Sequence, residues 1–289
     1  MNKKIDFVAL VSVYNANPNG DPLNGNRPRT DYDEIGEISD VCIKRKIRNR
    51  MMDMGKNIFV QSDDKTNDEF KSLKARAESK GIGKKGTKNE EAAKIACESW
   101  LDVRTFGQVL ALKGSDGNVS IGIRGPVSIQ LARSVDPVDI ASIQITKSVN
   151  NEDGEKKSSD TMGMKYFVRY GLYVVKGSIS SELAQKTGFN EEDAEVLKNC
   201  LATMFEGDSS SARPEGSMIV EKLYWFEQED MKKIPPREIH NSVVIAKKEG
   251  VEMPKSYGDY VVEFKPLENH DVKTICEDNI VVVKIKNEV

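Results

Sequence analysis

The chain has 289 residues, a length that allows one large domain or two modest ones. Hydrophobic residues make up 38% of it and charged residues 31%, with a mean hydropathy of -0.51. This composition is typical of a globular chain and excludes a membrane-embedded or collagen-like one. The formal net charge of -3 excludes a uniformly basic nucleic-acid binder, although 43 Lys and Arg leave enough charge for a local basic patch.

Metal-binding and targeting signals are weak. The two His and the four Cys form no CxxC pair or ligand cluster, so neither a zinc site nor a disulfide framework is expected. The start, MNKKIDFVALVSVYNANP, superficially resembles a signal peptide, but Asp6 borders its short apolar run. The alternation from Phe7 to Val13 favours a β-strand instead. We therefore expect a protein of the reducing cytoplasm, with no cofactor and no membrane contact.

A loop is predicted at residues 15–31, NANPNGDPLNGNRPRTD, because its Asn, Pro and Gly residues interrupt any regular element. The forked guanidinium groups of Arg27 and Arg29, and amide side chains such as those of Asn19 and Asn24, suit a polar ligand. Composition alone leaves two interpretations open, a ligand-binding loop and an ordinary solvated one.

A helix is predicted at residues 39–55, with Ser39 or Asp40 as its N-cap and Gly55 as its stop. Helical spacing gives it a core-facing stripe at Ile43, Ile47, Met51 and Met54. The remaining surface carries five basic residues, Lys44, Arg45, Lys46, Arg48 and Arg50. Since positions three or four apart lie side by side on a helix, Lys44, Arg45 and Arg48 suit a phosphate backbone. Phosphate binding is therefore favoured over an ordinary solvated face.

The middle of the chain contains a charge-rich segment followed by a segment with a strand pattern. Residues 63–94 are rich in charges of both signs and are interpreted as an insertion, and a helix is expected at 89–101. Asp102 and Arg104 are expected to form a local ion pair. Residues 119–131 alternate like a strand pair bent at Gly125-Pro126, with Arg124 as a polar candidate at the bend.

The second half suggests a protruding hairpin and a sheet. A polar tip between two potential strands predicts the hairpin at residues 134–165. A strand at 166–179, a helix capped by Asn190 at 190–205 and a strand at 218–228 follow. The order of elements resembles a βαββαβ ferredoxin-like unit, an α+β fold shared with RNA-recognition domains. Their aromatic RNA-binding consensus is absent, so base stacking on the sheet is not expected.

Catalysis has little support. Ser209, Ser210 and Ser211 show no GxSxG elbow. Acids in Asn-, Pro- and Gly-rich loops more often shape turns than bind metals. The chain is therefore expected not to be an enzyme. Two alternatives stay open: a metal-dependent ribonuclease using Asp21, Asp31 or Asp33, and a structural subunit that contacts only proteins.

Seven segments occur in order along the chain: NGDPLNGNRPRTD at 19–31, EISDVCIKRKIRNRMMDMG at 37–55, DVRTFG at 102–107, GIRGPVSIQ at 122–130, ITKS at 145–148, MGMKYFVRYGLYVVKG at 162–177 and DSSSAR at 208–213. Together they closely resemble the backbone subunit of type I CRISPR effector complexes, or Cascade, most like subtype I-C. The resemblance runs through most of the chain and rests on several motifs.

The resemblance implies an RRM-like palm at 1–55, 101–133 and 166–289, a helical finger insertion at 56–100 and a β-hairpin thumb at 134–165. It implies that the subunit binds CRISPR RNA, and that copies of it stack into a helical filament along the guide. Other Cascade subunits and the target DNA paired to the guide would be its further partners in antiviral defence. No catalytic role is implied, because target cutting belongs to a separate helicase-nuclease.

The resemblance also implies RNA-binding residues. The palm helix would supply Lys44, Arg45 and Arg48 to the RNA backbone, and the thumb of a neighbouring copy would kink the guide through Lys147 and Met162. Met162 would act as an apolar wedge at the unstacked step. The remaining members of the predicted set are Asn19, Asn24, Arg27, Arg29, Arg124, Lys165, Ser209 and Arg213. Since base pairing reads the sequence, a local stripe of backbone contacts is sufficient despite the acidic pI.

Overall fold

A large central sheet organises the chain. The computed structural model describes residues 1–83, 87–113, 118–146, 162–229, 234–267 and 270–287. Within these residues the sheet has nine strands: β1 (Lys4–Ala16), β4 (Ile35–Ile38), β7 (Val127–Ile129), β8 (Ala132–Pro137), β9 (Ile140–Thr146), β10 (Met162–Ile179), β11 (Met218–Gln228), β14 (His270–Glu277) and β15 (Ile280–Asn287). The order is β14-β15-β11-β1-β10-β8-β4, and β7 and β9 also pair with β10.

Strand β1 lies in the middle of this sheet, antiparallel to both β10 and β11. Every residue from Ile5 to Val13 is buried. Phe7 and Val11 pack with the helices on one face, whereas Val8 and Leu10 pack with the C-terminal segment on the other. The prediction of a strand at the start of the chain is confirmed, and burial on both faces explains why seven of the nine residues from Ile5 to Val13 are apolar.

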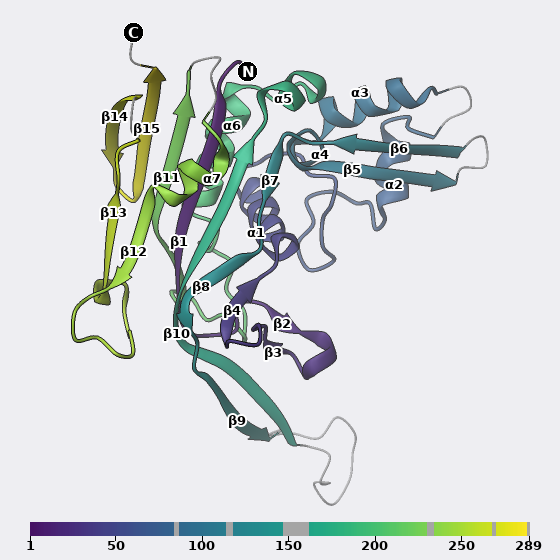
Figure 1. The fold of residues 1–289 in the computed structure, drawn as a ribbon. Coiled ribbons are helices and arrows are strands. Elements are labelled where there is room, and N and C mark those ends of the chain that lie inside the picture. The colour runs from purple at the N-terminus through teal and green to yellow at the C-terminus, as the bar shows by residue number, and fades with distance from the viewer. Residues whose placement is uncertain (84–86, 114–117, 147–161, 230–233, 268–269, 288–289) are drawn as a thin grey trace, which may run out of the picture.

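Helices cover one face of the sheet (Figure 1): α1 (Asp40–Asp53), α5 (Ser181–Thr187) and α6 (Glu191–Ala202). Ser39 caps α1 through its side chain, and Gly55 follows the helix with a left-handed φ of 73°, as predicted. The first three members of the apolar stripe of α1 are buried, but Met54 is 38% exposed because it lies beyond the last turn. Asn190 caps α6 in a capping box, again as predicted.

Six elements, separated by others along the chain, occur in the order strand, helix, strand, strand, helix and strand: β1, α1, β8, β10, α6 and β11. The neighbours β11-β1-β10-β8 are all antiparallel. The chain is therefore a mixed α+β fold around a large sheet. In the part of the chain that the structure describes, no helix is long and apolar enough to cross a membrane.

The C-terminal segment covers the opposite face of the sheet with α7 (Pro236–Asn241), β12 (Val243–Lys247), η3 (Tyr257–Asp259) and β13 (Tyr260–Phe264). Beyond β11 the sheet continues through β15, which pairs parallel to β11, and ends at β14. Residues 230–289 were expected to belong to the palm, with no element predicted in them.

Residues 57–124 form a lateral unit that projects beside the sheet (Figure 1). It contains α2 (Leu73–Ser79), α3 (Asn89–Ser99), α4 (Leu101–Phe106) and a two-stranded sheet of β5 (Gly107–Lys113) and β6 (Asn118–Arg124). Its own core includes Phe59 and Trp100, with ring centroids 4.7 Å apart, and Leu110 of β5. Strands β5 and β6 lie in the segment 101–133, which was expected to belong to the palm. They pack with the inserted helices instead, because their apolar side chains complete that core.

Two protrusions leave the lower end of the molecule in Figure 1. One is the antiparallel hairpin of β9 and the first half of β10, and residues 147–161 between these strands lie outside the described residues. The other is the N-terminal loop, which contains β2 (Gly20–Asp21), η1 (Pro22–Asn24) and β3 (Arg27–Pro28). The prediction that residues 15–31 contain no regular element is therefore wrong, because local hydrogen bonds close this small hairpin.

Candidate nucleic-acid interface

Three segments that are far apart in the sequence meet at the N-terminal half of α1. The amide N–H of Asn17 donates to the carbonyl of Ala212 at 2.9 Å, and Arg213 Nη1 donates to the carbonyl of Asn17 at 3.4 Å. Asn19 Oδ1 accepts from the amide of Ser39, the N-cap of α1, at 2.9 Å. We call this region the junction site, and it brings together three of the predicted residues: Asn19, Arg29 and Arg213. Ser209 is exposed beside Asp208 in the chain.

Asp208 organises the basic side chains of the junction site. Its carboxylate pairs with Lys46, accepts from Asn49 Nδ2 at 3.4 Å and lies 3.8 Å from Arg213 Nε. Arg213 Nε is buried and has no hydrogen-bond partner among the described residues. Burial raises the pKa of the nearby Cys42 thiol, and the positive charges of Lys46 and Arg213 oppose that shift. The junction site therefore concentrates positive charge from separate segments.

Lys46 and Asp208 are residues that sequence reasoning missed. Lys46 was expected on the surface of the helix, yet its side chain is only 7% exposed. A signal was present, since Lys46 lies three positions after Ile43 and one before Ile47, on the edge of the buried stripe. Asp208 opens the DSSSAR segment, but nothing local in that segment shows that its partner lies on α1.

Arg48 faces an internal acid. Its Nε donates to Asp102 Oδ2 at 2.9 Å, and the Arg48 side chain is only 12% exposed. Asp102 is fully buried and also accepts from the backbone amides of Phe59 at 2.7 Å and Val60 at 3.1 Å. A buried carboxylate needs such partners to offset its lost hydration. Arg48 and Asp102 thus fasten the start of the lateral unit to α1.

The other two predicted cations of α1 also have partners inside the molecule. Arg45 Nη1 donates to the carbonyl of Val60 at 2.8 Å, and burial lowers the pKa of its guanidinium. Lys44 pairs with Asp40 at 3.0 Å and lies 5.9 Å from the ring centroid of Phe106. The contact of Lys44, Arg45 and Arg48 with RNA stays a prediction, and the structure gives all three an internal role.

The expected ion pair between Asp102 and Arg104 is wrong, because each residue has a distant partner. Arg104 binds Asp193 of α6 through two nitrogens, at 2.8 and 2.9 Å, and donates to the carbonyl of Cys97 at 2.9 Å. Helix α4 therefore connects the lateral unit to α1 through Asp102 and to α6 through Arg104.

The N-terminal loop presents polar groups outward. Arg29 Nη2 donates to Asp21 Oδ1 at 3.2 Å, and the Arg29 side chain stays 40% exposed. The guanidinium of Arg27 lies 5.3 Å from the ring centroid of Tyr166 on β10, so the loop rests against the root of the hairpin. Asn24 is exposed at the tip of the loop.

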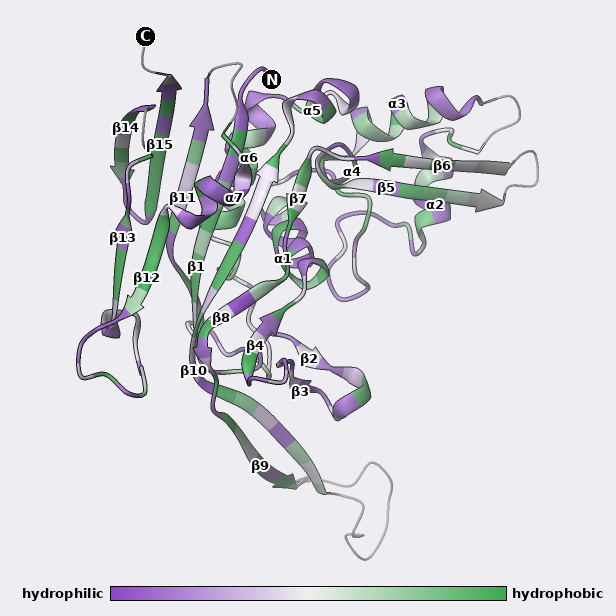
Figure 2. Cartoon of the chain, viewed as in Figure 1, coloured by the Kyte–Doolittle hydropathy of each residue, from purple (hydrophilic) through white to green (hydrophobic). Residues whose placement is uncertain are grey.

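The hairpin carries apolar side chains on both faces, and hydrophobic residues recur along β9 as it leaves the sheet (Figure 2). Met162 and Met164, 54% and 49% exposed, share one face, whereas Ile143 and Ile145, 45% and 47% exposed, share the other. Lys165 is half-buried on β10, and Lys147 lies outside the described residues. Exposed apolar residues in such a row indicate a surface that meets a partner.

Arg124 lies apart from these groups, because it ends β6 in the lateral unit, opposite Gly107. A Cβ on Gly107 would lie 2.1 Å from the carbonyl oxygen of Ile123, and one on Gly125 would lie 2.3 Å from the nitrogen of Gly107. This close approach of two glycines closes the base of the β5–β6 hairpin. The structure does not bring Arg124 to the junction site.

The acids of the ribonuclease alternative shape turns. Asp31 Oδ1 accepts from the amides of Asp33 and Ile35, both at 3.0 Å, and its other oxygen lies 3.5 Å from Arg133 Nη1. Asp21 caps η1 and pairs with Arg29. Among the described residues, no three His, Cys, Asp or Glu side chains are grouped so that they could hold a metal ion.

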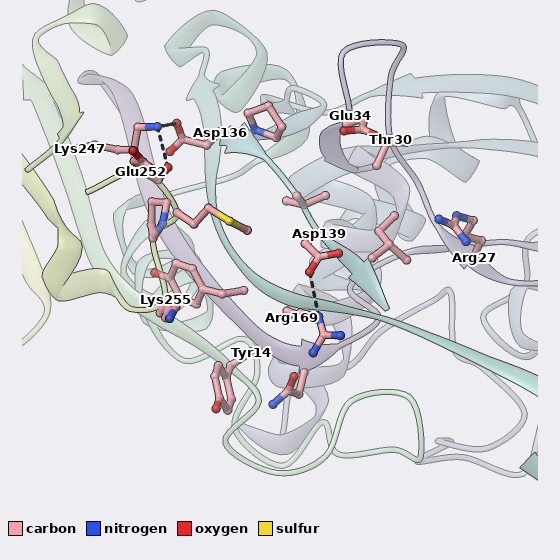
Figure 3. A pocket seen from close by; sticks show the side chains of 17 residues that line it. Tyr14, Arg27, Thr30, Glu34, Asp136, Asp139, Arg169, Lys247, Glu252 and Lys255 are labelled. Atoms are coloured by element: carbon pink, nitrogen blue, oxygen red, sulfur yellow. Dashed lines mark hydrogen bonds and ion pairs between the residues drawn. The ribbon is translucent and has the colours of Figure 1, made fainter. Parts of the chain in front are cut away.

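A cavity of about 890 Å³ lies near the root of the hairpin, between β1, β8, β10 and the loop after β12 (Figure 3). Its walls contain ion pairs between Arg169 and Asp139 at 2.8 Å and between Lys247 and Asp136 at 3.2 Å. Its lining holds four basic and four acidic residues, so it offers no net attraction to phosphate. The junction site is therefore the better candidate for a nucleic-acid backbone.

Comparison with known proteins defines the family. The family model described as CRISPR-associated protein Cas7 matches residues 3–265, so the chain belongs to this family. A curated relative from Haloferax volcanii, also described as CRISPR-associated protein Cas7, is 26% identical over 207 residues. That match covers 65% of this chain and 61% of the relative, so it spans about three fifths of the relative's length.

Two solved structures are also similar. A chain of a "CRISPR RNA-guided surveillance complex, pre-nicking" matches with a TM-score of 0.48 and 14% identity, over 76% of this chain and 77% of that one. A chain of a "CRISPR RNA-guided surveillance complex" matches with a TM-score of 0.38 and 18% identity, over 74% and 62% of the two chains.

Proposed function

We propose that this chain is the guide-binding backbone subunit of a type I Cascade complex, of the kind found in subtype I-C. Copies of it would line CRISPR RNA in the cytoplasm, beside other Cascade subunits, and present the guide for pairing with target DNA. In this proposal the central sheet is a ferredoxin-like palm, the lateral unit is the finger and the β9–β10 hairpin is the thumb. Membership of the Cas7 family supports the proposal.

The observation that carries the proposal is the convergence of cations at the junction site. Arg29 and Arg213 come from segments 184 residues apart (213 − 29) and lie at the same end of α1. The Arg29 side chain is 40% exposed, and the buried Nε of Arg213, 3.8 Å from Asp208 Oδ2, has no hydrogen-bond partner among the described residues. Guanidinium groups match phosphate oxygens in geometry, and such contacts position RNA without reading its sequence.

The hairpin supports a second kind of contact. Its exposed methionines, Met162 and Met164, lie on one face of two paired strands. Apolar side chains of this type separate stacked bases when they enter a nucleic acid. We therefore keep Met162 as a wedge of the proposed thumb.

We propose no reaction for this chain. Asp21 and Asp31 each accept backbone hydrogen bonds and each lie beside an Arg, which fits acids that shape turns. Incubation with labelled complementary RNA and Mg²⁺ is expected to leave that RNA intact. Cleavage that Asp21→Ala or Asp31→Ala abolishes would favour the ribonuclease alternative.

The test uses protein purified from cells that express a CRISPR array, followed by sequencing of the bound RNA. The double variant Arg29→Ala/Arg213→Ala removes two junction-site cations. The control Lys74→Ala/Lys94→Ala removes two cations from exposed pairs on α2 and α3. We expect guide RNA with the wild type and the control and much less with the junction-site variant. In this variant the slope of the logarithm of guide affinity against the logarithm of salt concentration should become less steep by about 1.4. Each phosphate contact on a single strand contributes about 0.7 to that slope.

Two outcomes would contradict the proposal. Equal RNA retention by all three proteins would place the RNA contact away from the junction site. A wild type that carries no guide RNA would favour the structural subunit that contacts only proteins.

A further inference from the structure

The tip of the N-terminal loop presents an apolar side chain to solvent. Leu23 is 97% exposed, between Pro22 and Asn24, which are also exposed. A single exposed Leu on a mobile loop would need no explanation. This loop, however, is held in one conformation.

Hydrogen bonds hold both sides of the loop. Asp21 Oδ1 accepts from the amide of Leu23 at 3.2 Å, and the Asp21 carbonyl accepts from the amide of Asn26 at 2.8 Å. Asn17, itself buried, donates through Nδ2 to the carbonyl of Asn26 at 2.6 Å. A Cβ on Gly20 would lie 1.9 Å from Asn26 Oδ1 and 2.9 Å from the Asn26 carbonyl oxygen, so a larger residue there would displace Asn26. Because the loop is already ordered, a partner that meets Leu23 bears little of the entropic cost of ordering it.

The groups around Leu23 suit RNA. The segment 20–29 contains Asn24, Asn26, Arg27 and Arg29 and a single acid, Asp21. The Asp21 carboxylate is engaged by Leu23 N–H and by Arg29. Amides and guanidinium groups bind base edges and phosphates, so the apolar tip stands among groups that attract a nucleic acid.

The loop also lies on the methionine face of the hairpin. Arg27 stacks over Tyr166, and a Cβ on Gly25 would lie 3.8 Å from the same ring. Tyr166, Met164 and Met162 alternate along β10, so their side chains share one face of the strand. In Figure 1 the loop lies beside the root of the hairpin. An RNA strand that crosses this face would meet the methionines and then Leu23.

We propose that Leu23 is a second apolar wedge, which enters between bases of the guide RNA at a step distinct from the one met by the hairpin methionines. This inference rests on the proposed guide-binding function. Leucine is among the side chains that unstack base steps in other complexes. A loop held by hydrogen bonds can keep the Leu23 side chain between two bases even though stacking favours their closing together.

The test compares Leu23→Ser with Tyr32→Ser. Tyr32 is 106% exposed in the next turn of the chain, but Asp31 and Asp33 flank it and would repel phosphate. Because both side chains are outside the core, both variants are expected to fold, with thermal unfolding close to that of the wild type. The probe is a guide RNA that carries 2-aminopurine at one position at a time, whose fluorescence rises when the base is unstacked.

We expect the wild type and Tyr32→Ser to give bright signals at two sets of guide positions, and Leu23→Ser to lose one set and keep the other. Leu23→Ser should also weaken guide binding by about 5-fold with an unchanged salt slope, because no charge is removed. The proposal is overturned if Leu23→Ser matches the wild type in both measurements. It is also overturned if guide binding is normal but association between copies is lost, which would make Leu23 a protein contact. A wild type that binds no RNA would overturn the proposed function instead.

Discussion

Helix α1 and the N-terminal loop are both basic, but their cations face different surroundings. On α1, Arg48 binds Asp102 and Lys46 binds Asp208, and both side chains are at least 88% buried. In the loop, Arg29 remains 40% exposed beside an acid that is itself part of the loop. A run of positive charge in the sequence can therefore be assigned to a ligand site only once the partners of each cation inside the protein are known.

The difference has a structural cause. Helix α1 lies between α6 and the lateral unit, so side chains outside its apolar stripe still meet other elements, as Arg50 meets Thr203 at 2.8 Å and Glu206 at 2.7 Å. The loop contacts the rest of the chain through Asn17, Asn19 and Arg27, whereas Leu23 and Asn24 at its tip are exposed. Its tip therefore stays available to a partner.

The largest expected effect comes from Asp102→Ala. This change leaves Arg48 and the buried amides of Phe59 and Val60 without their acceptor. Breaking a buried pair in this way should lower the free energy of unfolding by about 3–5 kcal/mol. Urea unfolding followed by circular dichroism would measure it. The control Glu98→Ala breaks only the exposed pair with Lys94 and should cost less than about 1 kcal/mol. Equal losses in the two variants would remove the structural role assigned to Asp102.

A second, smaller loss is expected for Arg48→Met. It removes the charged hydrogen bond to Asp102 but keeps the length and apolar contacts of the side chain, so unfolding should become easier by about 2–3 kcal/mol. Guide affinity per folded molecule should stay unchanged in a filter-binding assay. If stability were retained and RNA binding lost, α1 would contact RNA as the charge pattern predicts.

Arg29→Ala should show the opposite pattern. The half-exposed pair with Asp21 contributes about 0–1 kcal/mol to stability, so the unfolding curve should move little. The slope of guide affinity against salt should fall by about 0.7, because one phosphate contact is lost. Titrations at several salt concentrations would measure this slope, and a slope equal to that of the wild type would exclude Arg29 from the interface.

The smallest effect is expected for Lys44→Ala. Its pair with Asp40 is an i,i+4 pair on the helix surface, and such pairs contribute about 0.3–0.5 kcal/mol. Thermal unfolding should therefore change by no more than a degree or two. A larger drop would show that the contact of Lys44 with the Phe106 ring, 5.9 Å away, matters more than the ion pair.

Part of the site could be predicted from sequence. The loop and the DSSSAR segment contain Asn19, Arg29 and Arg213, and the structure brings these three together. Lys46 and Asp208 were missed, because a Lys within a basic helix and an acid at the end of a loop carry no local sign that they bind each other. Arg124 ends β6 in the lateral unit, away from these residues, and its contact with RNA stays a prediction.

The elements whose signals are local could be predicted from the sequence. Apolar and β-branched residues indicate β1, caps mark the ends of α1 and the start of α6, and β-branched and aromatic residues indicate β10. These signals act over a few residues, through backbone geometry and side-chain spacing. Tertiary structure alone decided that β5 and β6 join the lateral unit, and that Asp102 and Arg104 turn away from each other toward partners 54 and 89 residues away. The reason is that a buried charge must be neutralised by whichever opposite charge folding brings beside it, and that neighbour is set by how the elements pack.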